Sequence, residues 1–228
     1  MTAAQHPGTV PPGVVDRLRA AGVIPVVEIA DAGRALALAQ ALEAGGLALV
    51  EITFRTEAAA EALRRIARDA PAILLIAGTV KSTHLVDVAR NAGASLVISP
   101  GLNLQVVEHA AAIGMPMIPG VATPSEIEAA MSVGATTVKL FPIEPLGGVK
   151  YVQAVSGPYQ EMAWTPTGGI TPEGLPGYLQ LKSVLACGGS WVAPRTDVAA
   201  GNFEAIAARA ARAVEIVRGA RESKEDIR

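Results

Sequence analysis

Short apolar runs alternate with longer segments of mixed polarity along almost the whole chain. Most positions of each run are aliphatic or β-branched, and glycine, proline or polar residues bound it, which is the pattern of a buried strand. Strands are therefore predicted over residues 23–29, 47–53, 72–79, 95–99, 115–120, 136–141, 162–167 and 183–187.

Helices are predicted between these runs, because the intervening segments begin with N-cap residues and end at glycines. Asp31, Thr56 and Ser82 are candidate N-caps. The sequence TPSE at 123–126 combines an N-cap, a proline at the first helical position and a capping-box glutamate. A first helix is expected over 14–21 and the last over 202–220, whereas 143–148 is expected to be a loop.

Strand and helix thus alternate eight times, and this alternation predicts a parallel sheet with helical crossovers. Eight units indicate a single (β/α)8 TIM barrel, preceded by an N-terminal helix. An open, doubly wound sheet is the structural alternative, but the first strand is followed by no glycine-rich fingerprint. The barrel domain is expected over 14–220, after a flexible N-terminal tail at 1–13 and before a charged, frayed C-terminus at 221–228.

The composition argues against several classes of binding partner. The 228 residues are 50% hydrophobic and 18% charged, with a net charge of −2 and no basic block, so nucleic acid is not expected as a partner. The three histidines are widely separated in sequence, so a zinc or iron site built by the protein is not expected. No apolar run is long enough to span a membrane, and the N-terminus does not have the pattern of a signal peptide. Together with the single cysteine, Cys187, this predicts a cytoplasmic protein.

Lys139 is the unusual residue of the predicted strand 136–141. Strand side chains alternate, so Thr137, Lys139 and Phe141 share one face. If the other face packs against helices, the lysine points to the inner side of the sheet, where an ammonium is costly unless it is paired or has a chemical task. The alternative is a lysine at the strand end that extends to solvent.

A second ionisable group, Glu51, faces the same interior by the same alternation. Its alternative interpretation is a structural salt bridge to Lys139 or Arg55. Arg55 lies just past the predicted strand 47–53, where a solvated loop charge is the simple explanation. Active sites of (β/α)8 barrels lie at the carboxyl ends of the strands, so these positions are candidates for chemistry.

Two glycine-rich corners follow the seventh and eighth predicted strands, at 167–172 and 188–191. Glycine lets the backbone approach an anion closely and exposes N–H donors. A phosphate site after strands seven and eight recurs in barrels of this kind. The two corners together therefore indicate a phosphorylated ligand.

Six short motifs, in order and at matching spacing, resemble the motif series of 2-keto-3-deoxy-6-phosphogluconate (KDPG) aldolase. They are VEITFRT at 50–56, AGTV at 77–80, ISPG at 98–101, VKLFP at 138–142, PTGGI at 166–170 and GGSW at 188–191. The resemblance extends over about residues 14–219 and implies a class I aldolase that needs no cofactor and forms homotrimers. It also implies cleavage of 4-hydroxy-2-oxoglutarate (KHG).

The resemblance assigns a role to most of the candidate residues. Lys139 would be the Schiff-base lysine, Glu51 the proton-transfer residue, and Arg55 with Thr79 the pair that holds the pyruvyl carboxylate. The remaining residues would line the substrate site: Pro100 and Phe141 around the pyruvyl group, Thr167 at the aldehyde half, and Gly168, Gly169, Gly188, Gly189 and Ser190 at the phosphate.

The sequence departs from the family pattern at a few positions. Ile76 stands where a glycine is usual, and Pro145-Leu146 replace the usual Ala-Asn. Lys81, close to Thr79, is a second candidate amine. These departures bear on substrate preference and remove no catalytic group.

The resemblance thus implies cleavage of a phosphorylated 2-keto-3-deoxy sugar acid to pyruvate and glyceraldehyde 3-phosphate. One rival is a phosphate-binding epimerase or isomerase barrel, which would need no reactive lysine. The other is a non-catalytic barrel that binds a phosphorylated effector.

Overall fold

The protein was analysed as a computed structural model that describes residues 9–225. Two predictions therefore fall partly outside it, because residues 1–8 of the expected tail and 226–228 of the expected frayed end are not described. The first helix starts at Pro12, and the last continues to Glu225, past the expected boundary at 220.

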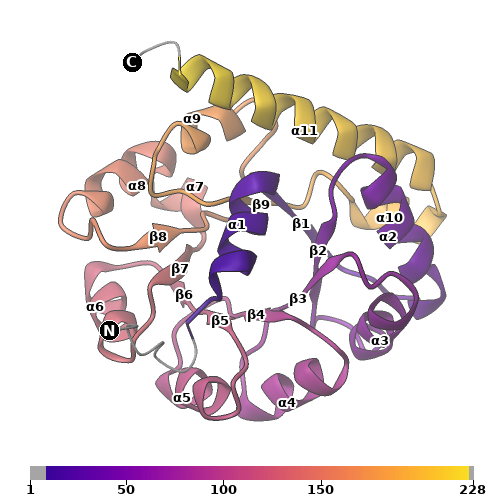
Figure 1. Ribbon diagram of the computed structural model, residues 1–228, viewed down its shortest axis with the longest axis horizontal. Coiled ribbons are helices and arrows are strands. Elements are labelled where there is room, and N and C mark those ends of the chain that lie inside the picture. The colour runs from indigo at the N-terminus through magenta and orange to yellow at the C-terminus, as the bar shows by residue number, and fades with distance from the viewer. Residues whose placement is uncertain (1–8, 226–228) are drawn as a thin grey trace.

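The strands form two parallel sheets at the centre of the molecule (Figure 1). A six-stranded sheet has the order β5-β4-β3-β2-β1-β9, and a three-stranded sheet has the order β6-β7-β8. Their bounds are β1 Val23–Val27, β2 Leu49–Thr53, β3 Leu74–Gly78, β4 Leu96–Ile98, β5 Met117–Ile118, β6 Gly120–Val121, β7 Thr137–Leu140, β8 Ala163–Trp164 and β9 Cys187–Gly189. The predicted α/β class with a curled parallel sheet is confirmed, although continuous strand pairing extends over six strands rather than eight.

The expected strand 115–120 is instead two short strands that belong to different sheets. Ile118 of β5 pairs with β4, whereas Gly120 of β6 pairs with Lys139 of β7. Pro119 lies between them and has no N–H to donate to a ladder. Its carbonyl is still used, because it accepts a hydrogen bond from the Lys139 N–H at 2.9 Å.

At the other side of the three-stranded sheet, two isolated parallel bridges lead towards β9. They join Trp164 to Val184 and Thr167 to Gly188. β9 is the edge of the six-stranded sheet, so the Thr167–Gly188 bridge connects the segment after β8 to that sheet.

The helices surround these strands (Figure 1). Their bounds are α1 Pro12–Ala21, α2 Ala35–Ala44, α3 Ala59–Asp69, α4 Thr83–Asn91, α5 Leu104–Ala112, α6 Pro124–Ser132, α7 Ile143–Leu146, α8 Gly148–Ser156, α9 Leu175–Leu179, α10 Arg195–Ala200 and α11 Phe203–Glu225, with a 3-10 turn η1 at Ala32–Arg34. Within residues 9–225, no helix is both long and apolar enough to cross a membrane.

Most predicted caps are observed, and one is wrong. Asp31 caps η1, Ser82 caps α4, and the capping box between Thr123 and Glu126 opens α6. Thr56 does not cap α3: its hydroxyl donates to the Ile29 carbonyl at 2.5 Å instead, and α3 begins three residues later at Ala59. The expected loop 143–148 also contains the short helix α7.

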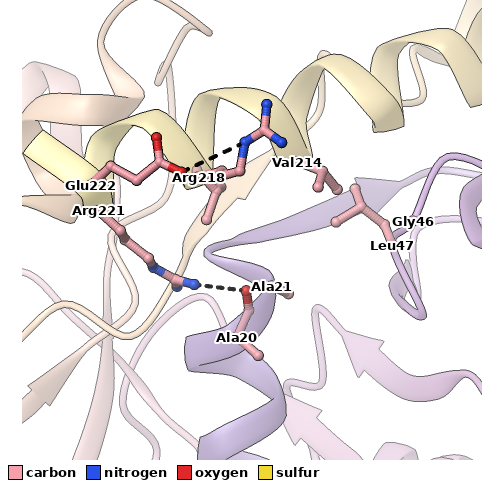
Figure 2. A pocket seen from close by; sticks show the side chains of 9 residues that line it. Ala20, Ala21, Gly46, Leu47, Val214, Arg218, Arg221 and Glu222 are labelled. Atoms are coloured by element: carbon pink, nitrogen blue, oxygen red, sulfur yellow. Dashed lines mark hydrogen bonds and ion pairs between the residues drawn. The ribbon is translucent and has the colours of Figure 1, made fainter.

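Helix α1 covers the amino ends of the strands, and the C-terminal end of the outer helix α11 packs against it. The Arg17 guanidinium donates to the carbonyls of Ala48 and Ala72, which precede β2 and β3. Arg221 of α11 donates to the Ala20 carbonyl at 2.9 Å, beside a pocket between the two helices (Figure 2). This pocket thus lies at the end of the strands opposite to the one at which the candidate catalytic groups were predicted.

Candidate active site

Strand β7 carries Lys139 into the interior. All four residues of the strand are buried, and Lys139 is only 6% exposed. Its Nζ lies 3.5 Å from Glu51 Oε1, on β2 across the interior. The alternative in which the lysine extends to solvent is therefore wrong.

Glu51 is itself 1% exposed and is paired with Lys139, not with Arg55. The neighbouring strand makes room for its carboxylate: a Cβ placed on Gly78 would lie 2.1 Å from Glu51 Oε1. Two opposite charges held this close share a proton-transfer path, and their burial removes the water that would otherwise solvate each of them. The pair can therefore support proton exchange between a carboxylate and an amine.

Phe141 and Pro100 border the same lysine. The Phe141 ring centroid lies 5.5 Å from Lys139 Nζ. Gly120 is directly opposite Lys139 in the β6–β7 ladder, and a Cβ on Gly120 would lie 2.3 Å from the Pro100 carbonyl carbon. The backbone of Pro100 thus packs against the strand next to Lys139.

Thr79 follows β3 and has a φ of 61°, the one positive φ outside glycine among the described residues. A β-branched residue rarely adopts this conformation, and such strain accumulates at functional sites. Lys81, the second candidate amine, is exposed on the loop that follows, so it does not share the burial of Lys139.

The first glycine corner is as expected, with φ values of 108° at Gly168 and 89° at Gly169. A side chain at Gly168 would meet the Phe141 ring, so this corner lies beside the residues around Lys139. Its backbone also holds α7, because the Glu144 N–H donates to the Gly168 carbonyl at 3.1 Å.

The second glycine corner needs a correction. Gly188 and Gly189 do not follow the last strand but lie within β9, opposite Ile24 and Pro25 of β1. The glycines are required there by neighbouring side chains: a Cβ on Gly188 would lie 2.5 Å from Thr167 Oγ1, and one on Gly189 would lie 2.9 Å from Trp191 Nε1. The Thr167–Gly188 bridge nevertheless brings the two glycine segments together.

The same strand contains Cys187, whose side chain is fully buried. Burial raises the pKa of the Cys187 thiol well above its ordinary value, so the thiol is neither a nucleophile nor a metal ligand in the folded protein. In the part of the chain that the structure describes, no three His, Cys, Asp or Glu side chains are grouped to hold a metal ion.

A cavity of about 390 Å³ opens at the carboxyl ends of β9, β1 and β2. The predicted residues Arg55 and Ser190 line it from the segments that follow β2 and β9, respectively. Glu28 and Arg195 also line it, and they form an ion pair of 3.1 Å. Neither was predicted, because Glu28 lies at the end of an apolar run and Arg195 lies in no recognisable motif.

Sequence comparison places this site in a known family. Residues 14–209 match the family model described as KDPG and KHG aldolase. The chain belongs to the KDPG and KHG aldolase family. As a member of this family, it is a lyase that cleaves a carbon–carbon bond.

Two curated members of the family show how much of the chain is shared. The chain is 42% identical over 204 residues to the 2-dehydro-3-deoxy-phosphogluconate aldolase of Treponema pallidum, with 90% of this chain and 97% of that protein covered. It is 42% identical over 193 residues to the KHG/KDPG aldolase of Escherichia coli K12, with 85% and 91% covered.

Crystal structures of family members share the fold. The KDPG aldolase of Legionella pneumophila, with pyruvate captured as a covalent carbinolamine intermediate, has a TM-score of 0.84 and 35% identity over 89% of this chain and 97% of that one. The enzyme of Zymomonas mobilis ZM4 with 3-phosphoglycerate has a TM-score of 0.81 and 37% identity, covering 88% and 94%.

The departures from the usual family sequence lie close to the site without altering its charged groups. Ile76 is buried in β3, opposite Glu51 in the β2–β3 ladder. Pro145 and Leu146 lie in α7, the short helix that packs behind the Gly168 corner.

Proposed function

We propose that the protein is a class I aldolase that cleaves 2-dehydro-3-deoxy-6-phosphogluconate (KDPG) to pyruvate and glyceraldehyde 3-phosphate, and that it also cleaves KHG. The observation that carries this proposal is the buried pair of Lys139 and Glu51, with 3.5 Å between the amine and the carboxylate. The names of the curated relatives and the pyruvate adduct of the Legionella enzyme support the same substrate class.

The reaction begins with the amine of Lys139. Its neutral form attacks the C2 ketone of the substrate, and Glu51 is close enough to accept the proton that the ammonium form must lose. The resulting carbinolamine loses water, with Glu51 returning a proton to the leaving hydroxyl, and the product is a protonated imine.

The iminium then accepts the electron pair of the C3–C4 bond. Glu51, directly or through a water molecule, removes the proton of the C4 hydroxyl, so C4 leaves as an aldehyde and C3 becomes part of an enamine. Protonation of the enamine at C3 and hydrolysis of the imine release pyruvate and regenerate Lys139. Arg55 with Thr79 binds the carboxylate of the pyruvyl half.

At the other half of the substrate, Thr167 contacts the aldehyde carbons. The backbone N–H groups of the two glycine segments and the Ser190 hydroxyl bind the phosphate. The positive φ values of Gly168 and Gly169 and the Thr167–Gly188 bridge support this assignment, as does 3-phosphoglycerate in the Zymomonas structure. No metal or organic cofactor has a step in this scheme.

For the molecule as a whole, we propose that the two sheets act as one closed (β/α)8 barrel. The Pro119 junction and the two bridges towards β9 support closure. We propose a trimer as the working assembly. A structure with 26% identity and a TM-score of 0.80 is a cage designed by fusing symmetric oligomeric domains, and this supports an oligomer. The single, unpaired Cys187 fits a cytoplasmic location.

The experiment that tests the function is reductive trapping. Incubation with pyruvate and borohydride is expected to add one reduced pyruvyl group per chain, on the peptide that contains Lys139. Lys139→Ala should abolish the adduct, whereas Lys81→Ala should retain it. An adduct on Lys81, or an active enzyme without any adduct, would contradict the proposed mechanism.

The same experiment separates the rival functions. An epimerase or isomerase would form no imine with pyruvate. A non-catalytic binding protein would release no pyruvate from KDPG in an assay coupled to lactate dehydrogenase.

A further inference from the structure

The cavity lined by Arg55 and Ser190 also contains charged side chains that have no role in the proposed function. Its lining includes two arginines, Arg55 and Arg195, and one carboxylate, Glu28. Arg55 is assigned to the pyruvyl carboxylate, so Arg195 is a second cation without an assigned role.

We propose that Arg195 binds the phosphoryl group of the substrate and that Glu28 holds the Arg195 side chain at the cavity when this group is absent. The proposal rests on the function proposed above and deepens it. It makes Arg195 a residue that determines specificity for substrates with a distal phosphate.

The order of the strands places Arg195 at the phosphate side of the cavity. The three strands lie in the order β9, β1, β2. Ser190, the proposed phosphate ligand, directly follows β9, and the chain continues from it through Pro194 to Arg195. Arg55 follows β2, so the two arginines approach the cavity from opposite sides of β1, which carries Glu28 at its end.

The ion pair is of the kind that a stronger anion can displace. Arg195 Nη1 lies 3.1 Å from Glu28 Oε1, and the Arg195 side chain is 73% exposed. Exposed pairs of this kind contribute little to stability, because water screens them. A phosphate carries more charge than one carboxylate, and the guanidinium fork can bind two of its oxygens at once.

Glu28 also explains how the side chain is kept near the cavity without a ligand. A free arginine side chain at this exposure would sample many rotamers, and binding would have to order it. Contact with the partly buried carboxylate of Glu28, whose side chain is 25% exposed, restricts that freedom. Glu28 is therefore a positioning residue. It holds the Arg195 side chain near the cavity and releases it when the phosphate binds.

The test compares steady-state kinetics of Arg195→Gln with KDPG and with its unphosphorylated analogue, 2-keto-3-deoxygluconate. The KM for KDPG should rise roughly 10- to 100-fold, the range for loss of a charge-assisted hydrogen bond, with kcat nearly unchanged. The KM for the unphosphorylated acid should stay within about twofold of wild type, because that substrate lacks the group that Arg195 binds. Inhibition by inorganic phosphate should weaken in the same variant.

Two further variants serve as controls. Arg64→Gln removes an exposed, ion-paired arginine from α3 and should leave both KM values unchanged. Glu28→Gln keeps the guanidinium that binds the phosphate but loses the contact that positions it, so its KM for KDPG should rise much less than that of Arg195→Gln. Equal increases in KM for Arg195→Gln and Glu28→Gln would show that only their ion pair matters and would overturn the proposal.

Failure of this inference can be told apart from failure of the proposed function. If Arg195→Gln raises KM as much for the unphosphorylated acid as for KDPG, or does not raise KM at all, Arg195 does not bind the phosphate. The pyruvate adduct on Lys139 should form in wild type and in this variant at the same rate. Its absence from wild type would instead reject the aldolase mechanism itself.

Discussion

The ammonium of Lys139 and the carboxylate of Glu51 lie together in the centre of an apolar interior. Taking two charges out of water costs several kcal/mol for each ion, and a buried pair often stabilises a fold no more than apolar residues of the same volume would. Stability alone therefore does not account for these residues. Gly78, whose missing side chain leaves space for the Glu51 carboxylate, indicates that the local packing is adapted to the pair.

Replacement of Glu51 by glutamine tests its chemical role. Glu51→Gln preserves the shape of the side chain but cannot accept a proton, so kcat should fall by about 10²- to 10⁴-fold. The protein should stay folded, but its melting temperature should fall somewhat, because the buried Lys139 ammonium loses its counter-charge. Circular dichroism and the coupled pyruvate assay measure the two quantities. Retained activity with a large loss of stability would make Glu51 a structural partner only.

Alternation along a strand was enough to predict which residues share the interior. It identified Lys139 and Glu51 as neighbours although they are far apart in the chain. The same reasoning could not find the Glu28–Arg195 pair, because Arg195 belongs to a segment without a regular period. This ion pair joins the residue after β1 to the first residue of α10, so it depends on which strands are neighbours, and one sequence does not specify that order.

At the scale of elements, the second glycine segment shows a limit of sequence interpretation. Two adjacent glycines usually indicate a turn, and so Gly188-Gly189 was predicted to follow the strand. In the structure they continue β9, because the side chains of Thr167 and Trp191 fill the space that a Cβ would need. The break at Pro119 was not predicted either: a single strand was expected over 115–120, and only the pairing partners reveal that β5 and β6 belong to different sheets.

The short helix α10 is held to α11 by one carboxylate. Asp197 accepts a hydrogen bond from the Asn202 amide and lies 2.6 Å from Arg209 Nη1. The hydrogen bond from Asn202, and then Arg209, lower the pKa of Asp197 below its ordinary value of 3.8. A carboxylate with a lowered pKa stabilises the fold at neutral pH, and this contribution is lost as the pH falls through the lowered value.

Asp197→Asn is therefore expected to lower the melting temperature at pH 7 by no more than a few degrees. The difference from wild type should shrink as the pH is lowered past the ordinary aspartate value and through the lowered pKa of Asp197, where the wild-type side chain also becomes neutral. Thermal melts across this range measure the effect. Asp16→Asn, at an exposed position on α1, is the matched control and should show a smaller difference at pH 7. A gap that widens on acidification would contradict the argument.

At the scale of the whole molecule, strands and helices surround the Lys139–Glu51 pair, and a cavity opens at one end of the strands. The cavity with Arg55 and Ser190 lies at the carboxyl ends, while α1 covers the amino ends. Strand–helix alternation correctly predicted parallel strands, whose carboxyl ends all lie on one side of the molecule.

The proposed trimer can be tested by measuring the mass of the particle in solution. Size-exclusion chromatography with light scattering should give a particle of about three times the chain mass of 23.3 kDa, independent of concentration over the micromolar range. The measurement requires no assumption about the interface. A particle with the mass of one chain would reject the trimer and would leave the active-site proposals unaffected, since every residue named in them comes from a single chain.

Burial of Cys187 has a practical consequence for fluorescence experiments. Because the only thiol of the chain lies inside β9 and resists ionisation, maleimide dyes should leave the folded wild-type protein unlabelled. A cysteine introduced at Leu104, which is 41% exposed on α5, would then be the single reactive position. Dyes placed there could report subunit exchange by energy transfer, without first removing the native cysteine from the core.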